Sequence, residues 1–164
     1  MIEHTTTSER AMALASQFEQ ANSEVIATVE HASPSEWRNV SPAESWTFGV
    51  AARHVAVAYL GINSIVQAIV NGDEIPNLDS LDDINAQHAR EHADCTPAEV
   101  LALLKQNGQT VAAYIRSLSD EQLDRAAPLA FAGGANMSAL QMIEGALTGH
   151  AKEHLQSLRD ARPA

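Results

Sequence analysis

Apolar side chains recur at alternating steps of three and four residues along four long stretches of the chain, the pattern of helices that bury one face. The first stretch follows Thr6 and Glu9, which stand at capping-box spacing, and we expect this helix to end near His31. The second begins after Thr47, a good N-cap residue, and ends at the Asn-Gly pair that includes Gly72. The pattern therefore predicts two long helices in the first half of the chain.

The second half of the chain repeats this pattern, with clear signals where helices start. Thr96 and Pro97 suit the N-cap and the first position of a third long helix. Ser138 and Gln141 stand at the spacing that opens a fourth. A polar segment at about 80–93 and the brief "SDEQL" predict short helices between the long ones, and "APLAFAGGANM" predicts a loose loop.

The order of these elements predicts an all-α protein, a four-helix bundle with short extra helical segments. No run of alternating β-branched residues indicates a sheet, and no repeat or long linker divides the chain, so we expect one domain over residues 1–164. The connections before Thr47 and before Thr96 are long enough to cross the bundle. Periodicity therefore leaves the up-and-down order of the helices open.

The composition excludes several classes of partner. The formal net charge is −11 and the ten Lys and Arg residues are scattered singly, which argues against a nucleic-acid partner. No stretch of about 18 consecutive apolar residues is present, so we expect no membrane-spanning helix, and the N-terminus lacks the layout of a secretory signal. These features predict a cytoplasmic protein without a membrane partner. The single cysteine, Cys95, leaves His, Asp and Glu as the ligands for any metal site.

Three histidines on apolar faces are the most informative polar residues. His150 and His154 stand four residues apart on the apolar stripe of the fourth helix, so their Cβ atoms lie about 5–6 Å apart on one face. His54 has the same inward phase in the second helix, between Val50 and Val57. Three protein ligands and an open position are typical of a catalytic zinc-type ion. The pattern therefore predicts a metal site at His54, His150 and His154.

Two other interpretations stay open on periodicity alone. The same histidines could be core residues of a metal-free bundle, although neighbouring imidazoles would then each need a separate hydrogen-bond partner. A rival pair, His88 and His92, also stands four residues apart, in a segment crowded with charged residues that is typical of a solvated face or a lid. The sequence pattern does not fully separate the two pairs.

Two stretches, "ESWTFGVAARHVAVAYLG" and "GALTGHAKEHLQSLRD", together resemble the DinB-like superfamily of four-helix bundles. This superfamily includes thiol-dependent S-transferases and the N-terminal domain of mycothiol-dependent maleylpyruvate isomerase. Its pattern has a Trp-Ser/Thr dipeptide that caps the second helix, here Trp46 and Thr47, and a histidine about two turns later, here His54. An HxxxH follows near the end of the fourth helix, here His150 and His154. The resemblance covers nearly the whole chain.

The resemblance implies a divalent ion, zinc or nickel, held by His54, His150 and His154 with open positions toward a pocket. It also implies an up-down-down-up helix order, a homodimer, and a small-molecule substrate used with a low-molecular-weight thiol. The stretch "DDINAQHAR" resembles the segment before the third long helix of the family, which implies a place for Asn85 near the metal pocket. The isomerase group tends to have a glutamate where His150 stands, so the resemblance favours the all-histidine branch.

These observations predict a metal-dependent enzyme that activates a thiol, as an S-transferase, or water, as a hydrolase, and the residues do not choose between the two. The alternative from another class is a noncatalytic metal- or ligand-binding stress protein that dimerises through its helices. Cys95, at a helix start, is a further candidate nucleophile. Glu144 is a candidate hydrogen-bond partner for an imidazole N–H.

Overall fold

Side-chain caps set where the helices begin. In the computed structural model, which describes residues 7–162, the predicted caps Thr47, Thr96 and Ser138 each accept a hydrogen bond from a backbone N–H of the first turn. The first helix differs, because its cap is Ser8, whose hydroxyl accepts from the Ala11 N–H. The predicted cap Thr6 lies outside the described residues.

Seven α-helical segments and a two-stranded hairpin occur within residues 7–162. In chain order the elements are α1 (Glu9–Glu30), η1 (Glu36–Arg38), α2 (Phe48–Asn71), α3 (Leu81–Glu91), α4 (Pro97–Arg116), α5 (Asp120–Asp124), β1 (Ala126–Leu129), η2 (Ala130–Ala132), β2 (Ala135–Ser138), α6 (Ala139–Gln141), η3 (Met142–Gly149) and α7 (His150–Asp160). The helices α1, α2 and α4 and the continuous rod of α6, η3 and α7 are the four long elements that the periodicity predicts.

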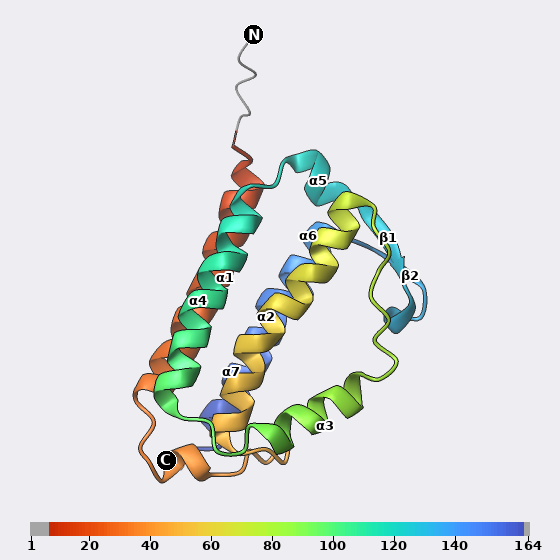
Figure 1. Cartoon of the computed structure of the whole chain (residues 1–164). Helices are drawn as coiled ribbons and strands as arrows, with labels where there is room; N and C mark the ends of the chain where they lie inside the picture. The colour runs from red at the N-terminus through yellow and green to blue at the C-terminus, as the bar shows by residue number, and fades with distance from the viewer. Residues whose placement is uncertain (1–6, 163–164) are drawn as a thin grey trace.

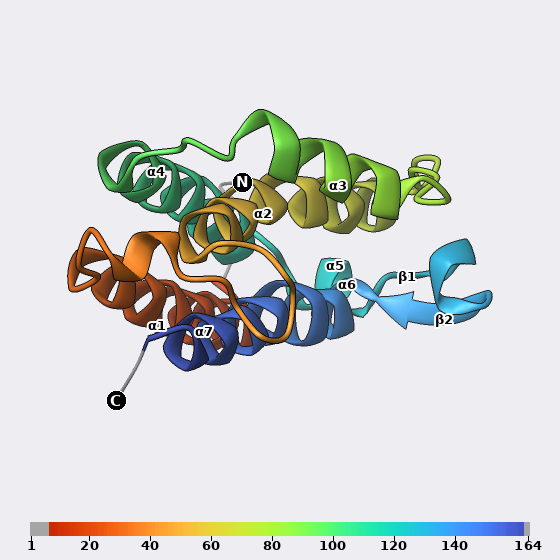
Figure 2. The ribbon, with the colours of Figure 1, turned by 90° about the horizontal axis from the view of Figure 1, so that it is seen from below.

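The four long elements form a bundle in the up-down-down-up order. In Figure 1, α1 and the α6–η3–α7 rod run toward the bottom of the view, whereas α2 and α4 run toward the top. The view along the bundle in Figure 2, together with the contacts between elements, shows that α4 and α7 each pack against both α1 and α2. The predicted fold class is confirmed. At the centre, the rings of Phe18 and Tyr59 meet edge to face with centroids 4.9 Å apart.

The connection predicted as a loose loop is a β-hairpin. The strands β1 and β2 pair antiparallel, with Ala126 opposite Ser138 and Leu129 opposite Ala135. Gly133 and Gly134 make the turn with φ values of 66° and 80°, a backbone conformation that glycine adopts without steric cost. The prediction was wrong because the strands are only four residues long and rich in alanine, which gives no alternating pattern.

The sequence pattern predicted a uniform α-helix for the last long element, but the structure differs. The segment η3 is a π-helix, whose wider turn brings residues five apart into line. Its buried residues Met142, Ile143, Leu147 and Thr148 follow this five-residue spacing. The π-helix leads directly into α7, whose first residue is His150. The wide turns of the helix therefore stand immediately before the predicted ligand pair.

The helix α2 is long and apolar enough to cross a membrane by length and composition, with a mean hydropathy of 1.3 over its most apolar window. This criterion is looser than the run of about 18 consecutive apolar residues that the sequence lacks. However, 56% of that window is buried inside the bundle, the pattern of a core helix.

Candidate metal centre

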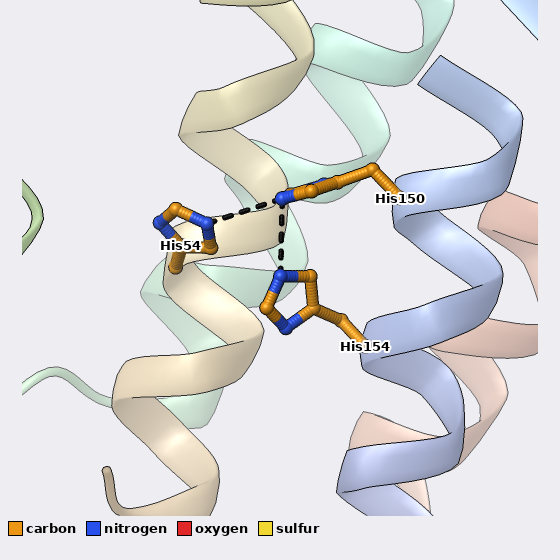
Figure 3. A group of neighbouring side chains, drawn as sticks. All are labelled: His54, His150 and His154. Carbon is orange, nitrogen blue, oxygen red and sulfur yellow. Dashed lines mark hydrogen bonds between the residues drawn. The ribbon is translucent and has the colours of Figure 1, made fainter. Parts of the chain in front are cut away.

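Three imidazoles from two helices converge at one level of the bundle. His54 lies two turns into α2, and His150 and His154 lie on successive turns of α7 (Figure 3). The Nε2 atom of His150 stands 3.2 Å from Nε2 of His54 and 3.0 Å from Nε2 of His154. All three histidines can place one nitrogen within 4.8 Å of the other two. The structure thus brings together the three residues that the periodicity singled out.

The spacing of these nitrogens fits a shared cation. Two histidine nitrogens bound to one ion at about 2.0–2.1 Å stand about 2.9–3.4 Å apart, for angles between octahedral and tetrahedral. Hydrogen bonds among the imidazoles alone fit less well, because one Nε2 hydrogen of His150 cannot lie along both contacts. The buried Nδ1 of His150 also lacks a partner among the described residues. The donor set is therefore suited to a divalent ion that takes nitrogen ligands.

A carboxylate that the sequence analysis did not single out orients one of the three rings. The side chain of Glu44 contacts Nδ1 of His154, and both side chains are largely buried, with exposures of 15% and 12%. A proton on Nδ1 toward Glu44 leaves the Nε2 lone pair of His154 facing the other two imidazoles. Glu44 therefore performs the role for which Glu144 was a candidate, whereas Glu144 is exposed on η3.

The loop that carries Glu44 is pinned at both ends. Ser41 donates its N–H to the Trp46 carbonyl at 2.7 Å, and Ser45 donates its N–H to the Ser41 carbonyl at 3.1 Å. Ser45 has a φ of 58°, a left-handed conformation that costs free energy for a residue other than glycine. The ring of Trp46 packs 5.1 Å from that of His54. Sequence periodicity cannot place a carboxylate on such a loop, although the stretch "ESWTFG" contains it.

Burial keeps two imidazoles of this cluster, those of His54 and His150, neutral. Removal from water, and then the neighbouring imidazoles, lower the pKa of His54 to about 3, and burial with His154 lowers that of His150 to about 4. For Glu44, burial would raise the pKa, but the contact with His154 and a hydrogen bond from Ser157 outweigh it and lower the pKa. His54 and His150 therefore present neutral nitrogen donors, and the carboxylate of Glu44 is ionised, which are protonation states that suit a cation.

A cavity of about 460 Å³ opens beside the cluster, between α2 and α3. His54 and His150 form part of its wall, and the cavity extends along α2 as far as Ile65. Asn85, for which the resemblance implied such a place, lines it from α3. The three-histidine cluster is thus not sealed by protein, which is the arrangement of catalytic metal sites rather than of closed structural ones.

The rival pair of histidines does not join the three-histidine cluster. His88 lies on the cavity wall with its ring centroid 6.0 Å from that of His54, and His92 lies 5.2 Å beyond it. Burial, then the charges of Arg53 and His92, lower the pKa of His88 to about 4. The segment that carries the pair therefore borders the site, as a lid would, and His88 is the member that faces it.

Cys95 is poorly suited to act as a nucleophile. It is buried, and burial together with the carboxylate of Glu99 raises the pKa of its thiol. The Cys95 carbonyl accepts a hydrogen bond from the indole Nε1–H of Trp37 at 2.9 Å, so this residue ties the start of α4 to the end of the bundle. The structure gives Cys95 a place in packing and none beside the histidines.

The fold and this site can be compared with known proteins. The chain has the fold of YfiT from Bacillus subtilis, described as a probable metal-dependent hydrolase with an unusual four-helix bundle topology, with a TM-score of 0.77. The two share 16% sequence identity, and the match covers 98% of this chain and 90% of the other. No curated protein matches the sequence. The sequence-family model of the DinB superfamily matches residues 17–158 of this chain. That span includes Glu44 and all three histidines of the cluster. The chain therefore belongs to the DinB superfamily.

Proposed function

We propose that this protein is a divalent-metal-dependent enzyme that activates a small nucleophile, a low-molecular-weight thiol or water, at His54, His150 and His154. One observation carries the proposal: three imidazole nitrogens from two helices converge beside an open cavity, with separations of 3.2 and 3.0 Å from Nε2 of His150 to the other two, which fit a shared ion. A divalent ion bound there supplies Lewis acidity, which lowers the pKa of a bound thiol or water toward neutrality. Zinc and nickel are the ions that we expect, because imidazole suits both.

Other residues of the chain orient the ligands and line the substrate side of the site. Glu44 holds His154 in the orientation that a ligand needs, and the pinned loop holds Glu44. The walls of α2 and α3 supply a mostly apolar surface beside the cluster, on the side where a substrate would enter. His88 and Asn85 supply polar atoms at the substrate side without belonging to the three-nitrogen cluster.

A noncatalytic metal-binding role fits the geometry less well. A structural zinc site has four protein ligands and is closed to solvent. Among residues 7–162 the group that could hold an ion consists of three histidines, and a cavity adjoins it. The probable hydrolase activity described for YfiT adds weight to catalysis, and a water nucleophile and a thiol would use the same residues.

The proposal is tested by assaying protein loaded with zinc or nickel for two reactions, thiol transfer to 1-chloro-2,4-dinitrobenzene and hydrolysis of p-nitrophenyl acetate. We expect one of these rates to exceed that of the metal-free protein, and His54→Ala to return it to the metal-free level. His31→Ala, which removes an exposed histidine away from the cluster, should leave the rate unchanged. Rates at the metal-free level with both metals and several thiols would contradict an enzymatic role.

A further inference from the structure

The cavity beside the histidines is almost wholly apolar, which restricts what it can bind. Residues 7–162 contribute no lysine, arginine, aspartate or glutamate to its wall. The wall consists of His54, Val57, Ala58, Gly61, Ile62, Ser64, Ile65, Pro76, Leu78, Leu81, Ile84, Asn85, His88 and His150. A charged group placed against the aliphatic part of this wall would lose hydration and meet no charged side chain, at a cost of up to several kcal/mol. Its volume of about 460 Å³ lies within the usual range for small-molecule sites, about 300–1,000 Å³.

Apart from Ser64, the polar residues of the wall are the histidines and Asn85. His88 contacts the ring of His54, and Asn85 lies one turn away from His88 on the same face of α3. The hydroxyl of Ser64, farther along α2, already donates to the Gly61 carbonyl at 2.6 Å. Beyond these residues the wall is aliphatic, and the lining residues of α2 extend over about 16 Å of helix from His54 to Ile65.

His88 has unused hydrogen-bonding capacity. Both of its ring nitrogens are buried and have no partner among the described residues. Burying such a group without a partner costs about 1–3 kcal/mol, so an unpartnered imidazole on the wall of a binding cavity is poised to pair with a ligand. Arg53, whose charge acts on the pKa of His88, is paired with Glu99 at 3.4 Å and does not line the cavity.

We propose that this cavity binds a neutral, apolar small molecule whose one polar, reacting group lies at the histidine end and is hydrogen-bonded by His88. The apolar part of the molecule extends along α2 toward Ile65. This inference rests on the proposed function for the identity of the reacting group, and it adds the class of substrate. It excludes a substrate or thiol that would place a charged group against the aliphatic wall of the cavity.

The first test measures the cavity without any metal. The neutral dye N-phenyl-1-naphthylamine is titrated into metal-free protein and its fluorescence is followed. The variants Ile62→Trp and Ala58→Leu add bulk inside the cavity, and Leu60→Trp, on an exposed neighbour of the same helix, is the matched control. We expect the wild type and Leu60→Trp to bind alike and both filling variants to bind at least about tenfold more weakly, after the loss of contact with several methylene groups.

The outcome of this test is decisive in either direction. Circular dichroism confirms that each variant is folded. Because the two filling variants differ in size, the test can still be made with one of them if the other does not fold. If the dye does not bind the wild type, or binds both filling variants as tightly as the wild type, the cavity does not take a neutral apolar ligand and the inference is overturned.

The second test measures charge selectivity with three thiols of equal chain length that displace the dye from zinc-loaded protein. We expect hexanethiol to bind at least about tenfold more tightly than either 6-mercaptohexanoate or 6-aminohexanethiol. The cationic thiol is essential, because the net charge of −11 would favour it if long-range attraction alone set the affinity. Equal or tighter binding of 6-aminohexanethiol would contradict selection for a neutral, apolar ligand.

The role of His88 is tested with the same displacement assay. We expect His88→Ala to weaken hexanethiol binding by about fivefold, the loss of one hydrogen bond, and His92→Ala to leave it unchanged because His92 does not line the cavity. Equal effects of the two substitutions would remove His88 from the proposal. A failure of the proposed function differs from these results, because it would abolish metal-dependent rates while dye binding by the metal-free cavity persisted.

Discussion

At the scale of single residues, the site depends on the protonation state of each imidazole, which a carboxylate sets for one ring and burial for the other two. The contact between Glu44 and Nδ1 of His154 assigns the proton of that ring, and the other two rings stay neutral because they are buried. The residues that carry the metal proposal are therefore four, and one of them comes from a loop.

We expect Glu44→Gln to weaken zinc affinity by about 10–100-fold, because the amide holds His154 less firmly and supplies no charge. Competition with a chromophoric chelator measures this affinity. Glu144→Gln, at an exposed position, is the control and should bind zinc as the wild type does. An unchanged affinity in Glu44→Gln would show that the carboxylate does not support the site.

Lowering the pH should destabilise the metal-free protein at pH values above those where most carboxylates titrate. His54 and His150 have pKa values of about 3 and 4 in the fold but about 6.5 when unfolded, so the unfolded chain binds protons first as the pH falls. Their contribution to stability is complete above about pH 6.5 and is lost as the pH falls toward about 4. We expect the Tm of metal-free protein to drop between pH 7 and pH 5 by at least about 4 °C. His54→Asn should reduce that drop, and an identical drop in the variant would contradict this assignment.

The core offers a matched pair of glycine substitutions. A Cβ on Gly108 would stand 2.2 Å from Nδ2 of Asn22, which is fixed by hydrogen bonds to the Leu104 carbonyl and from the Tyr59 hydroxyl. We expect Gly108→Ala to destabilise the protein by about 1–3 kcal/mol in urea unfolding. Gly61→Ala, where a Cβ meets nothing within 4 Å, should stabilise α2 by about 0.5–1 kcal/mol. Equal effects would contradict the packing described for α1 against α4.

At the scale of elements, local signals were predictable from the sequence and long-range ones were not. The caps Thr47, Thr96 and Ser138 act within one helical turn, so residue type and spacing sufficed to predict them. The hairpin and the π-helical turns of η3 depend on partners elsewhere in the chain or on packing, which residue spacing does not record. The same contrast separates the three histidines, which helical phase predicted, from Glu44, which a folded loop brings to His154.

The helix α3 should be the least stable of the longer helices. None of its residues is buried within the described chain, whereas α2 buries more than half of its own. We expect backbone amides of α3 to exchange with deuterium at least about 100-fold faster than those around Val55 and Tyr59, and a bound neutral ligand to slow α3 selectively. Equal protection of α3 and α2 would contradict the description of α3 as a lid.

At the scale of the whole molecule, the up-down-down-up order places the three-histidine cluster where two distant halves of the chain meet. The site takes His54 and Glu44 from the first half and His150 and His154 from the last twenty residues, so it forms only when α2 and α7 are packed together. An ion that binds this folded arrangement adds to the stability of the whole bundle. The fold class followed from periodicity, whereas the helix order needed the family resemblance, because long connections permit several orders.

The metal content of tag-free protein tests the central claim most directly. Elemental analysis after purification should find close to one zinc or nickel ion per chain in the wild type and in the control His31→Ala. His54→Ala and His154→Ala should each lose that ion, since two remaining nitrogens hold it far more weakly. Retention of a full complement of metal by both variants would contradict a site at His54, His150 and His154.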